Sequence, residues 1–403
     1  MIKILHIITG LSSGGAEIML WRLLSEMDPA SFGNEVISLT NLGEIAEKVR
    51  DLGIPVRALG MKRGIPNPFP AIRLARWIRS SKPHVVQTWM YHANLVGGLA
   101  AHFAGDVSLV WGIHHSDFDL RRNKRLTIWT AKACSLMSPW MPKCVVFCSQ
   151  SALRSHARIG YRARQMAVIS NAFDLQSFKP DPCAKSSVRA ELGVEAGVVL
   201  IGMAARFHPI KDHHNFVQAA ARLHARFPDV HFVLFGRDVT PENAQLNQWM
   251  EAAGIRSRCH LLGERADVAR LFSAMDIVAS SSLSEAFPLA IGEAMACGTP
   301  CVVTNVGDSG LLVDTTGKVV APENPEALAE AWGELIEAGP EVRRGLGMAA
   351  RCRVQRHFAL PAVVRQYESL YAQLAGETRA LASQNAQYLG FVRASGNRTK
   401  PTH

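Results

Sequence analysis

Short β-branched segments alternate with longer helical patterns along this chain, and the alternation limits the folds that the chain can adopt. The segment IKILHII at residues 2–8 is followed by the helical pattern AEIMLWRLLSEM, and HVVQTW at 84–89 is followed by HANLVGGLAAHF. Repeated strand–helix units of this kind form parallel sheets that helices cover on both faces. The sequence therefore predicts an α/β fold.

The alternation is interrupted at residues 171–187, where NAFDLQSFKPDPCAKSS is rich in Pro, Asp and Ser and indicates a connection between domains. A second series of strand-like segments then begins with VVLIGMAARF. We expect two tandem Rossmann-like domains, residues 1–178 and 179–360, whose parallel sheets face a central cleft. We also expect a helix at 361–380 that packs back toward the first domain, and a polar tail at 381–403.

Positive charge is concentrated in the first predicted domain. Residues 1–180 contain 22 Lys and Arg against 11 Asp and Glu, whereas residues 181–403 carry a net charge of −1. An anionic partner of the first domain, such as a phosphate-rich acceptor or a membrane surface, would account for this asymmetry. The alternative is a basic surface without any such partner.

The N-terminal sequence MIKILHIITGLSSGG is better explained as a first strand ending at a glycine turn than as a signal peptide, because no cleavage site follows the apolar run. No run of about 18 apolar residues occurs, so we expect no transmembrane helix. The eight cysteines form no CxxC pair and are expected to be small buried side chains in a reducing cytosol. We predict a cytoplasmic protein, with peripheral attachment to the inner face of the cytoplasmic membrane.

Two glutamates stand eight residues apart in SEAFPLAIGEAMACGTPCVVT at 284–304. Glu285 is predicted on a loop after the strand MDIVASS. Glu293 is predicted near the second turn of a helix that begins at Pro288 and stops before Gly298. A carboxylate can accept two hydrogen bonds from a vicinal diol, and a helix N-terminus binds anions, so the pair suits a sugar with phosphates. The alternative is that Glu293 caps or pairs locally.

This segment resembles the E-x7-E signature of the retaining glycosyltransferases of family 4, which have the GT-B fold and act in bacterial surface-polysaccharide synthesis. Ala286 and Cys301 replace the glycine and valine that are usual in the signature. The resemblance implies that Glu285 contacts hydroxyls of the donor sugar and that Glu293 contacts the ribose of the nucleotide. It also places four neighbouring residues at the donor: Ala286, Phe287, Pro288 and Leu289.

Further segments resemble the same family in the same order. GMAARFHPIKDHHNF carries Arg206 and Lys211 at the positions of the family's G-R-x4-K-G segment, with Asp212 where glycine is usual. Two cations on this loop would neutralise the diphosphate as it leaves, which makes both candidate catalytic residues. LSSGGAEIML resembles the donor loop of the first domain, where Gly14 and Gly15 let backbone amides approach a ligand closely.

Two histidines in WGIHHSDFD follow a predicted strand of the first domain. The family usually has one histidine on this loop near the donor sugar, and His115 fits that position better than His114. The resemblance therefore makes His115 a candidate catalytic residue that hydrogen-bonds the donor sugar. VGDSGLLV resembles another family segment, with Asp308 in place of a usual glycine, while His213 and His214 are expected on the surface at a helix start.

The resemblance implies transfer of a sugar from a nucleotide diphosphate sugar, with UDP favoured, to an acceptor hydroxyl, with retention of configuration. The donor would bind the second domain and the acceptor the first. Basic residues and a helix end would replace a metal, and no other cofactor is expected. Two alternatives stay open: a sugar-nucleotide epimerase of the same fold, and a non-enzymatic basic protein that binds a membrane or nucleic acid. The lack of an aromatic-lined RNA motif argues against nucleic acid as a partner.

The stretch RRNKRLTIWTAKACSLMSPWMPK at 121–143 contains four cations at its start and four large apolar residues after them: Arg121, Arg122, Lys124, Arg125, Trp129, Met137, Trp140 and Met141. A basic start with interfacial aromatics is typical of a helix that lies on a membrane. We predict from it a polyprenyl-phosphate-linked saccharide as the acceptor, as in exopolysaccharide, capsule or O-antigen synthesis. The alternative is an ordinary helix of the first domain that buries its apolar residues.

Overall fold

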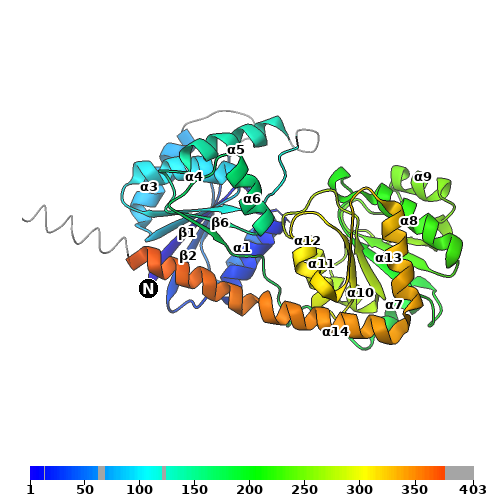
Figure 1. Ribbon diagram of the computed structural model, residues 1–403. Helices are drawn as coiled ribbons and strands as arrows, with labels where there is room; N and C mark the ends of the chain where they lie inside the picture. The colour runs from blue at the N-terminus through cyan, green and yellow to red at the C-terminus, as the bar shows by residue number, and fades with distance from the viewer. Residues whose placement is uncertain (13, 62–68, 120–123, 377–403) are drawn as a thin grey trace, which may run out of the picture.

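The computed structural model describes residues 1–12, 14–61, 69–119 and 124–376, which form two α/β domains (Figure 1). Within these residues the first domain has a seven-stranded parallel sheet in the order β3-β2-β1-β4-β5-β6-β7. Its strands are β1 (Ile2–Ile8), β2 (Phe32–Ser38), β3 (Val56–Ala58), β4 (Val85–Trp89), β5 (Ser108–Ile113), β6 (Cys144–Phe147) and β7 (Gln165–Val168). The strand order reverses between β1 and β4, so the loops after these two strands flank a topological switch point.

Helices cover both faces of the first sheet: α1, α2 and residues 360–376 on one face, and α3 to α6 on the other. The helices are α1 (Gly15–Glu26), α2 (Glu44–Asp51), α3 (Phe69–Ser81), α4 (Tyr91–Ala104), α5 (Arg125–Met137) and α6 (Gln150–Arg158). Successive strand side chains point to opposite faces, so Ile4 and Ile8 join the first core while Leu5 and Ile7 join the second. This double burial explains the continuous apolar strands of the sequence.

The second domain repeats the arrangement with a six-stranded parallel sheet, in the order β10-β9-β8-β11-β12-β13 within the described residues. Its strands are β8 (Leu200–Ala204), β9 (His231–Phe235), β10 (Cys259–Leu261), β11 (Ile277–Ser280), β12 (Cys301–Thr304) and β13 (Lys318–Val320). Its helices are α7 (Ala184–Leu192), α8 (His213–Arg226), α9 (Ala244–Ala252), α10 (Val268–Ala274), α11 (Leu289–Ala296), α12 (Ser309–Val313), α13 (Pro325–Glu337) and α14 (Gly339–His357). The sheet lies between α7, α10, α11 and α14 on one face and α8, α9 and α13 on the other.

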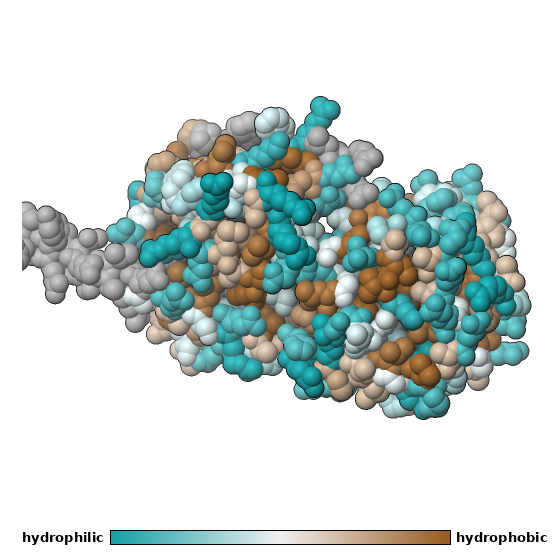
Figure 2. Space-filling model, viewed as in Figure 1, coloured by the Kyte–Doolittle hydropathy of each residue, from teal (hydrophilic) through white to brown (hydrophobic). Residues whose placement is uncertain are grey.

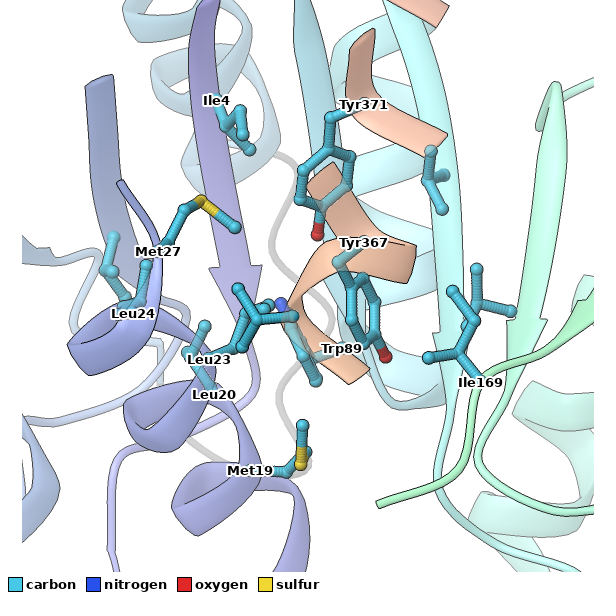
Figure 3. Close-up of a cluster of buried hydrophobic side chains, with 14 of the residues drawn as sticks. Ile4, Met19, Leu20, Leu23, Leu24, Met27, Trp89, Ile169, Tyr367 and Tyr371 are labelled. Carbon is cyan, nitrogen blue, oxygen red and sulfur yellow. The ribbon is translucent and has the colours of Figure 1, made fainter. Parts of the chain in front are cut away.

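The chain crosses back to the first domain after α14 (Figure 1). At the crossing, the Phe173 amide donates to the Phe358 oxygen and the Leu360 amide donates to the Phe173 oxygen, both at 3.0 Å. The helix over 360–376 then inserts Tyr367 and Tyr371 into the first core (Figure 3). Both domain connections therefore meet at one place, between residue 173 and residues 358–360.

The prediction of two parallel-sheet α/β domains is confirmed. The helix predicted at 123–142 is shorter: α5 spans Arg125–Met137, because Pro139 directly follows its C-cap Ser138 and cannot continue the helix. The predicted tail at 381–403 and the end of the helix predicted at 361–380 lie outside the described residues. None of the helices in the described part of the chain combines the length and apolarity that crossing a membrane requires.

Candidate active site between the domains

The second-domain residues predicted at the donor lie at the carboxyl ends of neighbouring strands. Glu285 follows β11, and Lys211 ends a single 3-10 turn (Pro209–Lys211) that follows β8. Because β8 and β11 pair directly, their following loops meet above the centre of the sheet. The fold thus brings together two side chains that are 74 positions apart in the sequence.

Two side chains hold the Glu285 carboxylate. The Lys211 ammonium forms an ion pair with Oε1, and the Ser282 hydroxyl donates to the same oxygen at 2.8 Å. From the first domain, the Ser116 hydroxyl donates to the backbone oxygen of Glu285 at 2.8 Å. The predicted sugar-binding carboxylate is therefore paired with a predicted diphosphate-binding cation at the junction of the two domains.

Glu293 forms an ion pair that crosses the domain boundary. Its Oε1 accepts a hydrogen bond from Nη2 of Arg22, on α1, at 2.5 Å, and Arg22 also donates to the Ala172 oxygen at 3.0 Å. Both side chains are almost completely buried. Burial raises the pKa of the Glu293 carboxyl, and the Arg22 charge and hydrogen bond partly lower it again. The partner of Glu293 is thus on the other domain and not local.

Arg206 and Lys211 give the loop after β8 a positive character. Burial lowers the pKa of His208, and the neighbouring charges of Arg206 and Lys211 lower it further. The Arg206 side chain is exposed and forms no ion pair with any residue that the structure describes. An exposed, unpaired guanidinium beside an ammonium is suited to binding a diphosphate.

The glycine loop of the first domain lies against the donor segment of the second. Gly14 is the extended N-cap of α1, and the atoms nearest to a Cβ there would be those of the Glu17 carboxylate, the end of a flexible side chain. A Cβ atom on Gly15 would lie 3.6 Å from Cδ1 of Leu289, the first residue of α11. The two segments predicted to bind the donor therefore face each other across the domain boundary.

The histidine loop after β5 carries two half-buried rings. His114 is stacked on Trp89 at 5.1 Å between ring centroids, and burial lowers its pKa to about 4. His115 lies edge-on to Tyr91, with 6.1 Å between ring centroids, and is followed by Ser116, which contacts the Glu285 backbone. The loop that carries His115 thus reaches the Glu285 loop of the second domain.

Asp308 makes a second contact between the domains. Its carboxylate oxygens accept hydrogen bonds from the amides of Gln150 and Ser151 at 2.7 and 2.8 Å, and its side chain is buried. These amides begin α6, whose N-terminus lacks intrahelical acceptors for them. An acidic residue at a position where the resembled family usually has glycine therefore caps a helix of the other domain.

Helix α11 starts one residue later than predicted, because Pro288 is its N-cap and not its first helical residue. Gly298 ends the helix with a φ of +79°, as its predicted role requires. Lys211, Glu285, Pro288 and Leu289 line a cavity of about 30 Å³ at the start of α11. This cavity is too small for a nucleotide diphosphate sugar, and all of its lining residues belong to the second domain.

Three further features of the described residues concern metal binding, the cysteines and His213. Among the described residues, no group of three His, Cys, Asp or Glu side chains is placed to hold a metal ion. Six cysteines are buried, as expected, whereas Cys183 and Cys352 are exposed. His213, expected on the surface, is buried against Phe207, with 5.3 Å between ring centroids, and burial lowers its pKa to about 4.

The sequence analysis assigned no functional role to two residues of the site, Arg22 and Asp308. Arg22 stands within the buried stripe of α1, between Leu20 and Leu23, and a cation in an apolar stripe is the signal that could have revealed it. Asp308 was noted only as a departure from the family pattern. Its partners on α6 could be identified only once the domains were placed together.

Two family models match the chain. The family described as "Glycosyltransferase Family 4" matches residues 13–177, and the family described as "Glycosyl transferases group 1" matches residues 198–338. Together they span the first domain and most of the second. The chain belongs to glycosyltransferase family 4, and its two Rossmann-like domains have the GT-B fold.

Relatives and solved structures agree with this class. EpsF of Bacillus subtilis (strain 168), named as a glycosyltransferase, is 25% identical over 349 residues, which are 83% of this chain and 86% of EpsF. The UDP-Gal:alpha-D-GlcNAc-diphosphoundecaprenol alpha-1,3-galactosyltransferase of Escherichia coli is 25% identical over 252 residues, 60% of this chain and 63% of that enzyme, so the match spans less than two thirds of its length. The crystal structure of Anabaena HepE in complex with UDP is similar, with a TM-score of 0.81 and 24% identity over 92% of this chain and 100% of that chain.

Family, fold and relatives therefore make this protein a glycosyltransferase. The comparisons give no support to an epimerase or to a non-enzymatic basic binding protein.

Proposed function

We propose that the protein transfers a sugar from a UDP-sugar to a hydroxyl of a lipid-linked saccharide, with retention of configuration and without a metal or other cofactor. The UDP donor and the lipid-linked acceptor are suggested by the name of the Escherichia coli relative and by the UDP bound to HepE. The observation that carries the proposal is the pairing of Glu285 with Lys211 beside the start of α11, at the junction with the first domain.

Each charged group of the site has a place along the donor. The Glu293 carboxylate on α11 would accept hydrogen bonds from the two hydroxyls of the ribose. The backbone amides at the start of α11 would face phosphate oxygens of the donor. Arg206 and Lys211 would neutralise the diphosphate as the bond to the sugar breaks, when negative charge develops on it. Glu285 would then exchange its ion pair with Lys211 for hydroxyls of the sugar.

The site changes its arrangement when the donor enters. The cavity of about 30 Å³ at the start of α11 must enlarge to admit the donor. Separation of the contacts of Ser116 with Glu285 and of Asp308 with α6 would open the space between the domains for its entry. Closure over the donor would restore these contacts and exclude water, which limits hydrolysis of the donor. His115 would approach the sugar because it lies on the same loop as Ser116. The acceptor hydroxyl would attack the sugar from the face on which the phosphate leaves. The leaving phosphate would take the proton of this hydroxyl.

The acceptor would approach from the first domain, at the inner face of the membrane that holds its lipid. The cation-rich stretch at 121–143 supports this placement, although Arg121 and Arg122 lie outside the described residues. The acceptor's saccharide, and not its lipid, would supply the reacting hydroxyl.

A donor screen followed by two substitutions tests the proposal. UDP-sugars should raise the unfolding temperature of the full-length protein more than ADP- or GDP-sugars do. Arg206→Ala and Lys211→Ala should each lower turnover at saturating donor by about 10²-fold, because both act on charge that grows in the transition state. Arg222→Ala, which removes an exposed α8 cation paired with Glu326, is the matched control and should leave turnover unchanged.

A chelator should leave wild-type transfer intact. The donor assignment is wrong if no nucleotide sugar binds, and the site assignment is wrong if both substituted proteins keep normal turnover while remaining folded.

A further inference from the structure

The exposed aromatic side chains of the described residues gather on one face of the first domain. Phe69 on α3, Phe103 on α4, Trp129 on α5 and Trp140 just after α5 are each 59–74% exposed, and no other Phe or Trp of the described chain is exposed to this degree. Three further exposed apolar residues lie on the same helices: Ile72, Leu126 and Leu136. We call these seven residues the α3–α5 face.

The three helices of this face lie side by side on one side of the sheet. They share a single buried core, and the rings of His102 on α4 and Trp140 after α5 have centroids 5.9 Å apart. On α5 the exposed residues Leu126, Trp129 and Leu136 follow helical spacing, so they form one outward stripe. Figure 2 shows apolar atoms on the part of the first domain where Figure 1 draws these helices.

The charge on these helices has one sign. α3, α4 and α5 contain no Asp or Glu, and their five Lys and Arg residues are Arg73, Arg76, Arg79, Arg125 and Lys132. From residue 52 to residue 173 the sequence has 17 Lys and Arg but only three Asp and Glu. The three helices of this face therefore contribute to the excess positive charge of the first domain.

The five cations of these helices form no ion pair with described carboxylates, and three of them contact aromatic rings or backbone oxygens. Lys132 lies 5.5 Å from the Trp129 ring centroid and Arg73 lies 4.5 Å from that of Trp77. Arg79 donates to backbone oxygens at the end of α4. In the second domain, by contrast, exposed arginines such as Arg226 pair with carboxylates across neighbouring helices.

Three kinds of partner could cover such a surface. A second copy of the chain would bring two sets of unpaired cations together, which is unfavourable. A nucleic acid would satisfy the cations but would leave the leucine and isoleucine side chains without an apolar partner. An anionic lipid bilayer provides phosphates for the cations and an apolar layer for the aromatic and aliphatic side chains.

We propose that the α3–α5 face docks on an anionic lipid bilayer, with its aromatic side chains at the level of the headgroups. This inference rests on the proposed function in one respect, namely that a bilayer holds the acceptor. The face differs from the stretch at 121–143 predicted from the sequence, because Met141 is buried and Met137 is half-buried. It extends instead across α3 and α4, which the sequence prediction left out.

The position of the face suits a lipid-linked acceptor. Helices of this sheet begin near the carboxyl ends of its strands, which is the side of the cleft. Phe69 is the first residue of α3 and Leu126 the second of α5, so one edge of the face lies on the cleft side of the domain. Docking through this face would bring the mouth of the cleft close to the headgroup layer, where a saccharide on a lipid diphosphate is presented.

Co-sedimentation of the full-length protein with vesicles tests the proposal. The protein should pellet with phosphatidylglycerol vesicles at low salt, release at high salt, and stay in solution with phosphatidylcholine vesicles, because exposed charges are screened beyond about 8 Å at physiological ionic strength. Arg73→Gln, Arg76→Gln and Lys132→Gln combined should lower partitioning by about 100-fold, since each cation near an anionic surface is worth a factor of about five.

A second variant removes apolar groups without changing charge. Trp129→Ser with Trp140→Ser should lower partitioning at least tenfold. Each variant has a matched control on the second domain: Arg222→Gln, Arg226→Gln and Arg344→Gln for the charges, and Val342→Ser with Met348→Ser for the exposed apolar residues of α14. Both controls should pellet with vesicles as the wild type does.

Calorimetric titration with UDP separates the two proposals. Variants of the α3–α5 face should bind UDP normally, so loss of vesicle binding with intact UDP binding supports the docking face. Equal pelleting with neutral and anionic vesicles, unchanged partitioning of both variants, or a dimer in sedimentation velocity that these substitutions dissociate would overturn it. A protein that docks on vesicles but binds no nucleotide would instead refute the proposed function and leave the face standing.

Discussion

Glu293 is a carboxylate whose ionisation depends on a residue of the other domain. Burial raises its pKa, and Arg22 lowers it by its charge and hydrogen bond. Only the ionised form accepts hydrogen bonds from both hydroxyls of a ribose without donating one itself. Arg22 therefore acts as a positioning residue for nucleotide binding, although it lies on the domain proposed for the acceptor.

Replacement of the cation tests this role. In Arg22→Met the pKa of Glu293 should rise further, so that at neutral pH more of the carboxyl is protonated and UDP binds more weakly. Loss of one charge-assisted hydrogen bond predicts a decrease of about tenfold or more. The deficit relative to wild type should shrink as the pH is raised, because the carboxyl then loses its proton.

Calorimetric titration of UDP at several pH values measures this effect, and the ratio to wild type cancels the titration of UDP itself. Arg22→Lys, which keeps the charge, is the control and should bind more tightly than Arg22→Met at neutral pH. A ratio that stays constant with pH would rule out control of Glu293 by Arg22.

The sequence identified candidate residues that belong to one continuous motif, and missed those that act across the boundary. Glu285 and Glu293 share one loop–helix unit, so their spacing alone places them near each other. Arg22 approaches Glu293 from 271 positions away, and nothing in local periodicity encodes that distance. Interdomain contacts depend on how two cores dock, which a single sequence without the fold does not reveal.

At the scale of elements, helix α6 depends on an N-terminal cap to which both domains contribute. Its own N-cap, Ser149, accepts a hydrogen bond from the Ala152 amide at 3.0 Å. The two amides before that are satisfied by Asp308 of the second domain. The cap therefore ties the start of α6 to the segment after β12, and loosening it should loosen the closed arrangement.

Removal of this cap predicts a change in shape as well as in stability. Asp308→Ala should lower the free energy of unfolding by about 1–3 kcal/mol, because two buried amides lose their acceptor. The radius of gyration from small-angle scattering should increase in the absence of nucleotide, since one clasp between the domains is lost. Glu334→Ala, which breaks an exposed ion pair within the second domain, should leave the radius unchanged. An unaltered radius in Asp308→Ala would show that this contact does not hold the domains together.

Element boundaries were the least accurate part of the sequence prediction. Helix α5 stops at Met137 because Pro139 directly follows the C-cap Ser138 and has no amide hydrogen with which to continue the helix. Pro288 caps α11 from outside, since its backbone has the extended conformation, with a ψ of 102°. In both cases a proline lies at the boundary, and its exact position relative to the helix end is set by the local backbone geometry.

At the scale of the whole molecule, the first domain is completed by the end of the described chain. Tyr371 is fully buried, and its hydroxyl lies 3.3 Å from Oε1 of Gln87 on β4. The Ser108 hydroxyl donates to the Leu374 oxygen at 3.0 Å. Tyr367 lies parallel to Trp89, with 6.2 Å between ring centroids. The helix over 360–376 is therefore part of the first core and not an appendage.

Replacing a buried side chain of this helix with a smaller one should destabilise the first domain, which is far away in the sequence. Tyr371→Ala removes a buried aromatic ring and should cost about 3–5 kcal/mol. Hydrogen–deuterium exchange of the full-length protein should accelerate in β1 and β4 more than in β8 and β11. The matched control Trp332→Ala, buried in the second domain, should give the reverse pattern. Equal acceleration in both sheets would mean that the two domains unfold as one unit.

The global fold was predictable because it rests on a repeated local signal. Each strand of both sheets is a short apolar run followed by a helix, so the number of parallel domains could be read from the alternation. The helix over 360–376 was expected near the first domain, but the tyrosines that fill its core could not be assigned to it from spacing. The single meeting point of the two connections, at Phe173, depends on backbone hydrogen bonds between segments far apart in sequence.

The return of the chain to its first domain has a consequence for biosynthesis. A ribosome releases the first domain before the second, yet the core around Trp89 stays incomplete until the residues near 374 emerge. While the second domain is being made, that apolar face is exposed to chaperones and proteases. A message that breaks between residues 179 and 360 therefore yields a product whose first domain is unfinished, and such a product is open to degradation before it can bind any sugar nucleotide.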